Sequence, residues 1–275
     1  MDRWLRALAR LVGTALGAFA GIVALQLIRL RRTTFLDHPG FEVDHVVGTE
    51  RPRANAPALR MIVFGDSTVA GVGVERAEHA LPVQLARDVA GARHRPVHVT
   101  SYGWAGARVA DLGNEQIPRA LSVAPGGLTE ADIVAVVIGS NDATHRTPPR
   151  RYRSSVRQAL GLIRAAAPGA EVVLAGIPNL RGTLRHVEPL IWLTDQYARL
   201  LRPISRQEAE RAGAAFADLA GRLPPSLTRQ PGALSADRFH PSALGYRAWA
   251  QVIAEALAAG PPWATARLEA DDVGA

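Results

Sequence analysis

The stretch Arg60-Met-Ile-Val-Phe-Gly-Asp-Ser-Thr-Val69 decides how the rest of the chain is interpreted, because a short apolar run ends there in a glycine turn. Met61–Phe64 followed by Gly65 predicts a buried strand. Similar short runs recur at residues 97–102, 133–138, 171–175 and 214–218. Longer amphipathic stretches separate them. The sequence therefore predicts an α/β fold, a three-layer α/β/α sandwich around a five-stranded parallel sheet with right-handed crossovers.

The expected helices occupy about residues 78–90, 107–122, 151–167, 194–212 and 242–258. The last of them follows Pro241, and Ser242 is a candidate N-cap because its hydroxyl can accept from the first free N–H groups. In a sheet of this kind, ligands bind beyond the carboxyl ends of the strands. We therefore expect the functional side chains at those ends.

Chemically useful residues follow three of the predicted strands and precede the last helix. The segments are Gly65-Asp66-Ser67, Ser101-Tyr-Gly103-Trp104-Ala105-Gly106-Ala107, Gly139-Ser140-Asn141-Asp142 and Asp237-Arg-Phe-His240-Pro241. Each has an ordinary explanation when taken alone, as turn chemistry or as a helix cap beside a surface histidine. A serine nucleophile, however, needs a base, and the base needs an acceptor on its other nitrogen. Asp237, three residues before His240, can supply that acceptor.

Taken together and in this order, the four segments resemble the blocks of the SGNH/GDSL hydrolase family over about residues 60–258. The resemblance implies the flavodoxin-like SGNH hydrolase fold and a serine esterase that cleaves carboxylic esters through an acyl-serine intermediate. Ser67 would be the nucleophile, His240 the general base and Asp237 the carboxylate that orients it. An acyltransferase using the same three residues is an alternative, and a non-catalytic envelope-binding protein is a third interpretation.

The resemblance also implies an oxyanion hole made by the backbone N–H of Ser67, the N–H of a glycine after the second strand, and the side chain of Asn141. Gly106 fits this glycine better than Gly103, because Ala105-Gly106-Ala107 matches the small turn that opens the next helix in the family. Ser101 stands where many relatives have asparagine, so the match is loose at that position.

Substrate contacts are expected from the loops after the third and fourth strands, Thr144 to Arg153 and Ile177 to about Thr194. Trp104 is the preferred substrate-binding candidate, ahead of Trp192, although both tryptophans could instead belong to the core. The ester could be a lipid, a short aryl ester, an acetylated sugar or a thioester, and the residues do not separate these.

The N-terminal segment has the composition of a membrane anchor. Residues 11–28 contain no charge and one amide, Gln26, and are just long enough to cross a hydrocarbon core of about 30 Å. The Arg-rich sequence that follows is a poor signal-peptidase site. We therefore expect a single-pass anchor at 1–32, a linker at 33–58, the hydrolase domain at 59–260 and a flexible tail at 261–275.

Three arginines lie on each side of the span, at positions 3, 6 and 10 and at positions 29, 31 and 32, so the positive-inside rule is nearly balanced. We expect an extracytoplasmic catalytic domain by analogy with other anchored hydrolases. Gly13, Gly17 and Gly21 lie four residues apart on one helix face. Such a strip allows a homodimer of close-packed helices, but glycine is also common in membrane helices, and both interpretations stay open.

The composition gives little reason to expect a nucleic-acid partner, despite a net charge of +7. All 32 basic residues are arginine, which together with abundant alanine suggests a GC-rich coding bias. The arginines are scattered, and no nucleic-acid-binding motif accompanies them. The absence of cysteine excludes disulfides, thiolate metal sites and a cysteine nucleophile. The histidines have no metal-binding spacing, so we expect neither a metal nor a cofactor.

Overall fold

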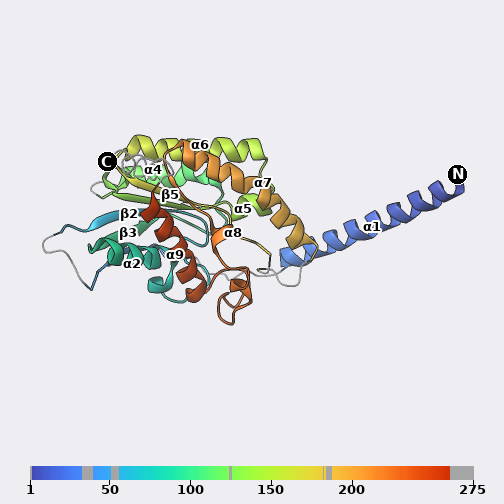
Figure 1. The fold of residues 1–275 in the computed structure, drawn as a ribbon, viewed down its shortest axis with the longest axis horizontal. Helices are drawn as coiled ribbons and strands as arrows, with labels where there is room; N and C mark the ends of the chain where they lie inside the picture. Colours follow the sequence, from blue (N-terminus) through green and yellow to red (C-terminus); the bar gives the residue numbers. More distant parts are fainter. Residues whose placement is uncertain are drawn as a thin grey trace, which may run out of the picture.

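The computed structural model describes residues 2–32, 40–50, 56–123, 126–181, 183 and 188–260. A long helix, α1 (Asp2–Arg32), projects from a layered α/β domain built by the other described residues (Figure 1). The expected tail at 261–275 lies outside the described residues.

Within the described residues, six strands form one sheet in the order β1-β3-β2-β4-β5-β6. Their bounds are β1 Asp44–Val47, β2 Leu59–Gly65, β3 Val97–Ser101, β4 Ile133–Val137, β5 Glu171–Ala175 and β6 Ala215–Ala217. Strands β2 to β6 pair in parallel, so the five parallel strands expected from the sequence are confirmed. The chain leaves β2 towards β3 on one side and then crosses to β4 on the other. The loops beyond β2 and β4 therefore flank a crevice at the carboxyl edge.

The sixth strand corrects the sequence interpretation. Strand β1 lies within 33–58, which we expected to be a linker, and it pairs antiparallel with β3 so that Asp44 faces Thr100 and Val47 faces Val97. It has only four residues, of which Val47 alone is buried. A short edge strand of this kind has no alternation of apolar and polar residues by which the sequence could mark it.

Helices cover both faces of the sheet (Figure 1). One face carries α2 (Leu81–Arg93) and α9 (Ala243–Ala259), and the other carries α4 (Ile117–Ser122), α6 (Pro149–Ala166) and α7 (Leu190–Arg211). Successive residues of β2 point alternately into the two cores, as the pleat of a strand requires. The three-layer sandwich expected from the sequence is therefore present.

The shorter elements lie mostly in the loops at the sheet edges. They are α3 (Val109–Asp111), the π-helical turn η2 (Leu112–Gln116), α5 (Ser140–Thr144), α8 (Leu219–Arg222) and the 3-10 turns η1 (Ala77–His79), η3 (Leu128–Glu130) and η4 (Leu227–Arg229). Ser242 caps α9 as expected, because its hydroxyl accepts hydrogen bonds from the N–H groups of Leu244 at 3.1 Å and Gly245 at 3.4 Å. This cap fixes the start of α9 next to the loop that carries His240.

Helix α1 is long and apolar enough over Arg3–Gln26 to cross a membrane, and such an N-terminal helix is either a signal sequence or an anchor. At Gly13, Gly17 and Gly21, an added Cβ would meet no atom within 4 Å. The face that we expect to contact a second copy is thus uncovered, and the homodimer stays a prediction.

Candidate active site

A hydroxyl, an imidazole and a carboxylate meet at the carboxyl edge of the sheet. Ser67 lies in the turn after β2, and His240 lies in the loop before α9. Ser67 Oγ is 3.0 Å from His240 Nε2, and His240 Nδ1 is 2.7 Å from Asp237 Oδ2. Ser67 and His240 are both buried. The structure therefore brings together the three side chains that the sequence singled out, with the imidazole in the middle.

Asp237 is held by hydrogen bonds within its own loop. Its Oδ1 accepts from Ser235 Oγ at 2.7 Å and from the backbone N–H groups of Phe239 at 2.9 Å and His240 at 3.0 Å. Burial alone would raise the pKa of Asp237, but these bonds and the His240 side chain outweigh it and hold that pKa well below its ordinary value. An ionised Asp237 favours the tautomer with its proton on Nδ1, which leaves Nε2 of His240 able to accept from Ser67.

The turn that carries Ser67 is held in place through Gly65, the last residue of β2, and the side chain of Gln116. At Gly65 a Cβ would lie 2.2 Å from the carbonyl oxygen of Val137, so the close approach of β2 and β4 requires glycine there. The fully buried side chain of Gln116 accepts the N–H of Gly65 at 3.0 Å and donates to its carbonyl at 2.7 Å. Nothing in the sequence marks Gln116, because it lies in a π-helical turn 51 positions away from its partner.

Asp66 stabilises the same turn through hydrogen bonds with Thr68. Its Oδ1 accepts hydrogen bonds from the N–H of Thr68 at 3.0 Å and from the Thr68 hydroxyl at 2.9 Å. Burial raises the pKa of Asp66 to about 6, and the two bonds from Thr68 only partly offset that effect. Asp66 therefore titrates close to neutral pH beside the Ser67–His240 pair.

Two hydrogen bonds join the loops after β3 and β4. Asn141 Nδ2 donates to the carbonyl of Ala107 at 3.0 Å, and the N–H of Val109 donates to the buried carboxylate of Asp142 at 2.9 Å. A side-chain amide has two N–H donors, and this contact uses one of them. Asn141 also lines the cavity that holds Ser67, and its second N–H is not used by the contact with Ala107.

The two glycines after β3 have different environments. Gly106 has a φ of +84°, and an added Cβ there would meet no atom within 4 Å. At Gly103 a Cβ would lie 2.7 Å from the Val69 side chain, so Gly103 allows that loop to pack against the turn after Ser67. Gly106 is not among the residues that line the cavity, although it adjoins Ala107, to which Asn141 is bonded. Its role as an oxyanion donor stays a prediction.

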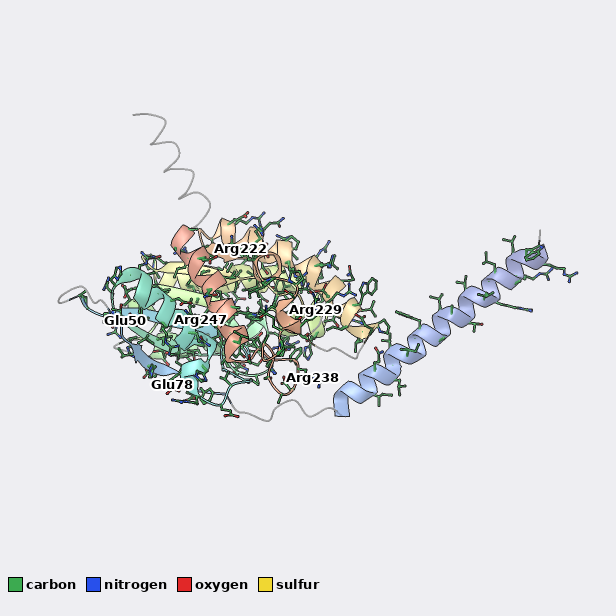
Figure 2. All side chains as sticks on the ribbon, turned by 60° about the horizontal axis from the view of Figure 1, so that its bottom comes forward. Glu50, Glu78, Arg222, Arg229, Arg238 and Arg247 are labelled. Atoms are coloured by element: carbon green, nitrogen blue, oxygen red, sulfur yellow. The ribbon has the colours of Figure 1, made fainter. Side chains whose placement is uncertain are left out.

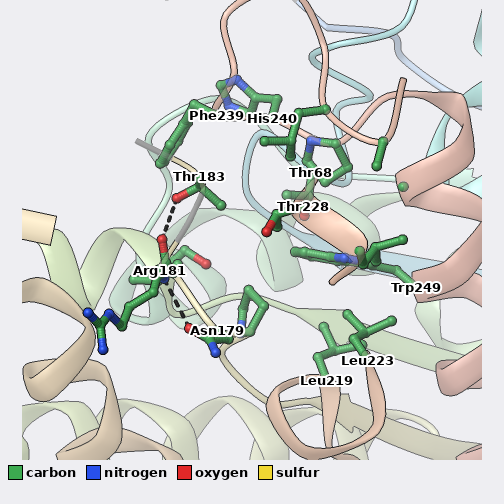
Figure 3. A pocket seen from close by; sticks show the side chains of 18 of the residues that line it. Thr68, Asn179, Arg181, Thr183, Leu219, Leu223, Thr228, Phe239, His240 and Trp249 are labelled. Atoms are coloured by element: carbon green, nitrogen blue, oxygen red, sulfur yellow. Dashed lines mark hydrogen bonds between the residues drawn. The ribbon is translucent and has the colours of Figure 1, made fainter. Parts of the chain in front are cut away.

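The cavity beside Ser67 is mainly apolar (Figure 3). Asn141 and His240 lie in its wall, and the apolar lining includes Leu180, Leu219, Leu223, Leu227, Phe239 and Trp249. In Figure 3, Trp249 lies on the same side as Leu219 and Leu223, while His240 and Phe239 lie across from them. A ligand with a hydrocarbon portion can therefore bind beside the Ser67 hydroxyl, with that portion against the apolar wall.

The tryptophans expected to contact substrate lie elsewhere. Trp104 is partly buried and packs against the core, Trp192 is 41% exposed on α7, and neither lines the cavity. The wall uses Trp249 of α9 instead. The segment 219–234 after β6 also contributes, whereas we expected only the loops at 144–153 and 177–194. Of those two loops, the second does line the cavity, through residues such as Leu180.

Among the residues that the structure describes, no group of three histidine or carboxylate side chains is arranged to hold a metal ion. Three polar groups lie together at the cavity. They are a hydroxyl hydrogen-bonded to a ring nitrogen, a carboxylate behind the ring, and the side-chain amide of Asn141, which also lines the cavity.

Known proteins resemble this chain in sequence and in fold. The model of the GDSL-like lipase/acylhydrolase family matches residues 63–248. A GDSL-like esterase of Mycobacterium tuberculosis is 28% identical over 204 residues, which cover 72% of this chain and 62% of that protein. The chain thus matches less than two thirds of the length of this curated relative.

Solved structures share the fold at low sequence identity. A lipase from a goat-rumen metagenome has a TM-score of 0.60 at 19% identity, covering 72% of this chain and 97% of its own. An acetylxylan esterase of Geobacillus stearothermophilus has a TM-score of 0.52 at 20% identity, covering 73% of this chain and 94% of its own. Each comparison leaves about a quarter of this chain unmatched.

Proposed function

Because this chain belongs to the GDSL-like lipase/acylhydrolase family, we propose that it is a serine esterase that hydrolyses carboxylic esters through an acyl-Ser67 intermediate. The observation that carries the proposal is the 3.0 Å contact between Ser67 Oγ and His240 Nε2, with Asp237 bonded behind the ring. A hydroxyl so placed can lose its proton to the imidazole as it attacks a carbonyl carbon.

The mechanism has two halves. In the first, Ser67 Oγ bonds to the ester carbon while its proton passes to His240 Nε2, and the carbonyl oxygen becomes an oxyanion. Collapse of this intermediate breaks the bond to the alcohol, which leaves with the proton from His240. In the second half, His240 takes a proton from water, the hydroxide attacks the acyl carbon, and Ser67 regains its proton as the acid departs.

The oxyanion would be stabilised by the N–H groups of Ser67 and Gly106 and by the free amide hydrogen of Asn141. Such donors act strongly because they are aimed before the charge develops and need not reorganise. The bond from Asn141 to Ala107 supports this assignment, since it fixes the amide plane and the Gly106 loop relative to each other.

A panel of p-nitrophenyl esters of increasing acyl length tests the proposal with the purified full-length chain. We expect hydrolysis by the wild type and loss of it in Ser67→Ala. The apolar wall with Trp249 and Leu223 supports acyl chains longer than acetyl. Equal hydrolysis by the two proteins would show that Ser67 is not the nucleophile.

An acyltransferase is the second candidate, because transfer to an alcohol or sugar uses the same acyl-Ser67 and replaces only the water. Analysis of products with added alcohols separates the two, since a transferase forms a new ester faster than free acid. A non-catalytic envelope-binding protein would show neither product.

We also propose that α1 is retained as a single-pass anchor with the catalytic domain outside the cytoplasm. The Arg-rich end of the helix supports retention, because it lacks the small residues that signal peptidase requires. A C-terminal fusion to a reporter that is active only outside the cytoplasm tests the orientation. The mass of the purified membrane-bound protein tests whether the helix is retained.

A further inference from the structure

Helix α1 leaves the domain on the side that carries the cavity. In Figure 1 it projects from the side where α5 and α8 lie, and these two short helices directly follow β4 and β6. The carboxyl ends of the parallel strands, and with them Ser67 and Asn141, therefore lie on the side towards α1.

The apolar stretch of α1 ends in a polar contact with the domain. Gln26, the only amide in residues 11–28, accepts a hydrogen bond from the N–H of Leu190 at 3.2 Å and donates one to the carbonyl of Glu188. The part of α1 suited to crossing a membrane, Arg3–Gln26, ends at this contact. A domain attached at that point lies directly on the membrane surface.

Helix α7 connects this attachment to the wall of the cavity. Leu190 is its first residue, and the buried carboxylate of Asp195 accepts from the N–H of Leu180 at 3.2 Å and from Arg202 at 2.8 Å. Arg202 also donates to the carbonyl of Pro178 at 2.6 Å. Both Leu180 and Pro178 line the cavity. The loop between β5 and α7 is thus held to the anchor at one end and shapes the cavity at the other.

Exposed side chains on this face suit contact with lipid headgroups. Trp192, in the first turn of α7, is 41% exposed, and tryptophan concentrates where a membrane meets water. Arg229 and Arg238 are exposed and lie towards α1, whereas Glu50 and Glu78 lie on the opposite side of the domain (Figure 2). Arginine side chains near a membrane are attracted to anionic lipids.

From these contacts we propose that the face carrying the cavity lies against an anionic membrane surface, held there by the contact of Gln26 with the start of α7. The substrates are then ester-bearing amphiphiles of that membrane, which enter the cavity from the lipid–water interface. The choice of substrate rests on the proposed esterase function, whereas the orientation of the domain does not.

Depth-dependent quenching tests the orientation. The chain has no cysteine, so Arg229→Cys and Glu50→Cys each give one labelling site, on opposite sides of the domain. The full-length variants are labelled with an environment-sensitive fluorophore in vesicles of phosphatidylcholine and phosphatidylglycerol that contain nitroxide-labelled lipid. We expect severalfold stronger quenching at position 229 than at position 50. Equal quenching at both, stronger quenching at position 50, or none at either would overturn the orientation.

The variant Gln26→Leu then tests what the contact does. Leucine keeps α1 apolar but removes both hydrogen bonds, so quenching at position 229 should fall. The rate on a long-chain p-nitrophenyl ester dissolved in the vesicles, divided by the rate on soluble p-nitrophenyl acetate, should fall about fivefold for each of the two hydrogen bonds lost. Thr14→Val is the matched control, because Thr14 bonds only within α1, to the carbonyl of Arg10.

An unchanged rate ratio in Gln26→Leu, with quenching at position 229 reduced, would overturn the link between orientation and substrate. Absence of hydrolysis of either ester by the wild type would instead refute the proposed function. The quenching result would still decide the orientation in that case, because it does not depend on catalysis.

Discussion

The side-chain amide of Asn141 donates a 3.0 Å hydrogen bond to the carbonyl of Ala107, and so joins the loop after β4 to the loop after β3. This bond orients the amide while leaving one N–H free at the cavity wall. It supports the proposal that Asn141 donates to an oxyanion formed at Ser67.

Replacing Asn141 by alanine should lower kcat by about 10²–10³, the usual cost of one lost oxyanion donor, with the chain still folded. Steady-state kinetics on a p-nitrophenyl ester measures the effect. Asn179→Ala is the matched control, since Asn179 lines the same cavity but bonds to the N–H of Arg181. Similar losses in both variants would contradict a specific role for Asn141.

Replacing Asp237 by asparagine should lower kcat/KM by about 10⁴, because an amide can hold the ring of His240 in the tautomer that cannot accept the proton of Ser67. Asp218→Asn is the control. In the wild type the carboxylate of Asp218 accepts a hydrogen bond from the N–H of Gly221 in α8. A kcat/KM within tenfold of wild type in Asp237→Asn would argue against the proposed role.

Replacing Leu223 by tryptophan should narrow the cavity next to Trp249 and shift the preference towards short acyl chains. One methylene in an apolar pocket is worth about 10–200-fold in kcat/KM, so the ratio of octanoate to acetate ester hydrolysis should fall at least tenfold. Leu162→Trp, at a leucine 37% exposed on α6, is the control. An unchanged ratio would show that the acyl chain binds elsewhere.

Replacing Asp66 by asparagine should stabilise the chain at high pH. The pKa of Asp66 is raised by burial to about 6 from an ordinary value of 3.8, so the folded state binds the proton more tightly than the unfolded state. The free energy of unfolding therefore falls as pH rises from about 4 through 6. The total loss is about 3 kcal/mol, because each of the roughly two units by which the pKa is raised corresponds to about 1.4 kcal/mol. Asparagine removes this penalty while retaining an acceptor for Thr68.

Chemical denaturation at two pH values measures this effect. The free energy of unfolding of Asp66→Asn should exceed that of wild type by about 1–3 kcal/mol at pH 8 and should match it near pH 4. The same difference at both pH values would mean that titration of Asp66 is not its cause.

The sequence predicted the parallel strands well because each is a short run, mostly apolar and mostly buried, that is bounded by turns. The start of α9 was equally clear, since Ser242 is a strong N-cap before an apolar helix. The segments around Ser67 and His240 could be assigned to one site because, together with the other two segments, they resemble the blocks of the SGNH/GDSL family. Distances between these groups could not be obtained this way, since they depend on how the loop before α9 folds back over β2.

Other features leave no mark in the sequence. Strand β1 is short and mostly exposed, so it lacks periodicity. The side chain of Gln116 forms two hydrogen bonds with the backbone of Gly65, and only the tertiary fold brings these groups together. Trp249 has the spacing of an ordinary core residue of α9, yet it also forms part of the cavity wall. Trp104 follows a strand as a ligand contact would, but its side chain packs against the core instead.

The most direct measurement is covalent labelling with a fluorophosphonate, followed by peptide mass analysis of the full-length chain. An acyl-serine mechanism through Ser67 predicts one adduct, on the peptide that contains this residue, and none in Ser67→Ala. Ser140→Ala is the matched control, because Ser140 lines the same cavity, and it should label like the wild type. An adduct that persists in Ser67→Ala, or that maps to Ser140, would contradict the mechanism.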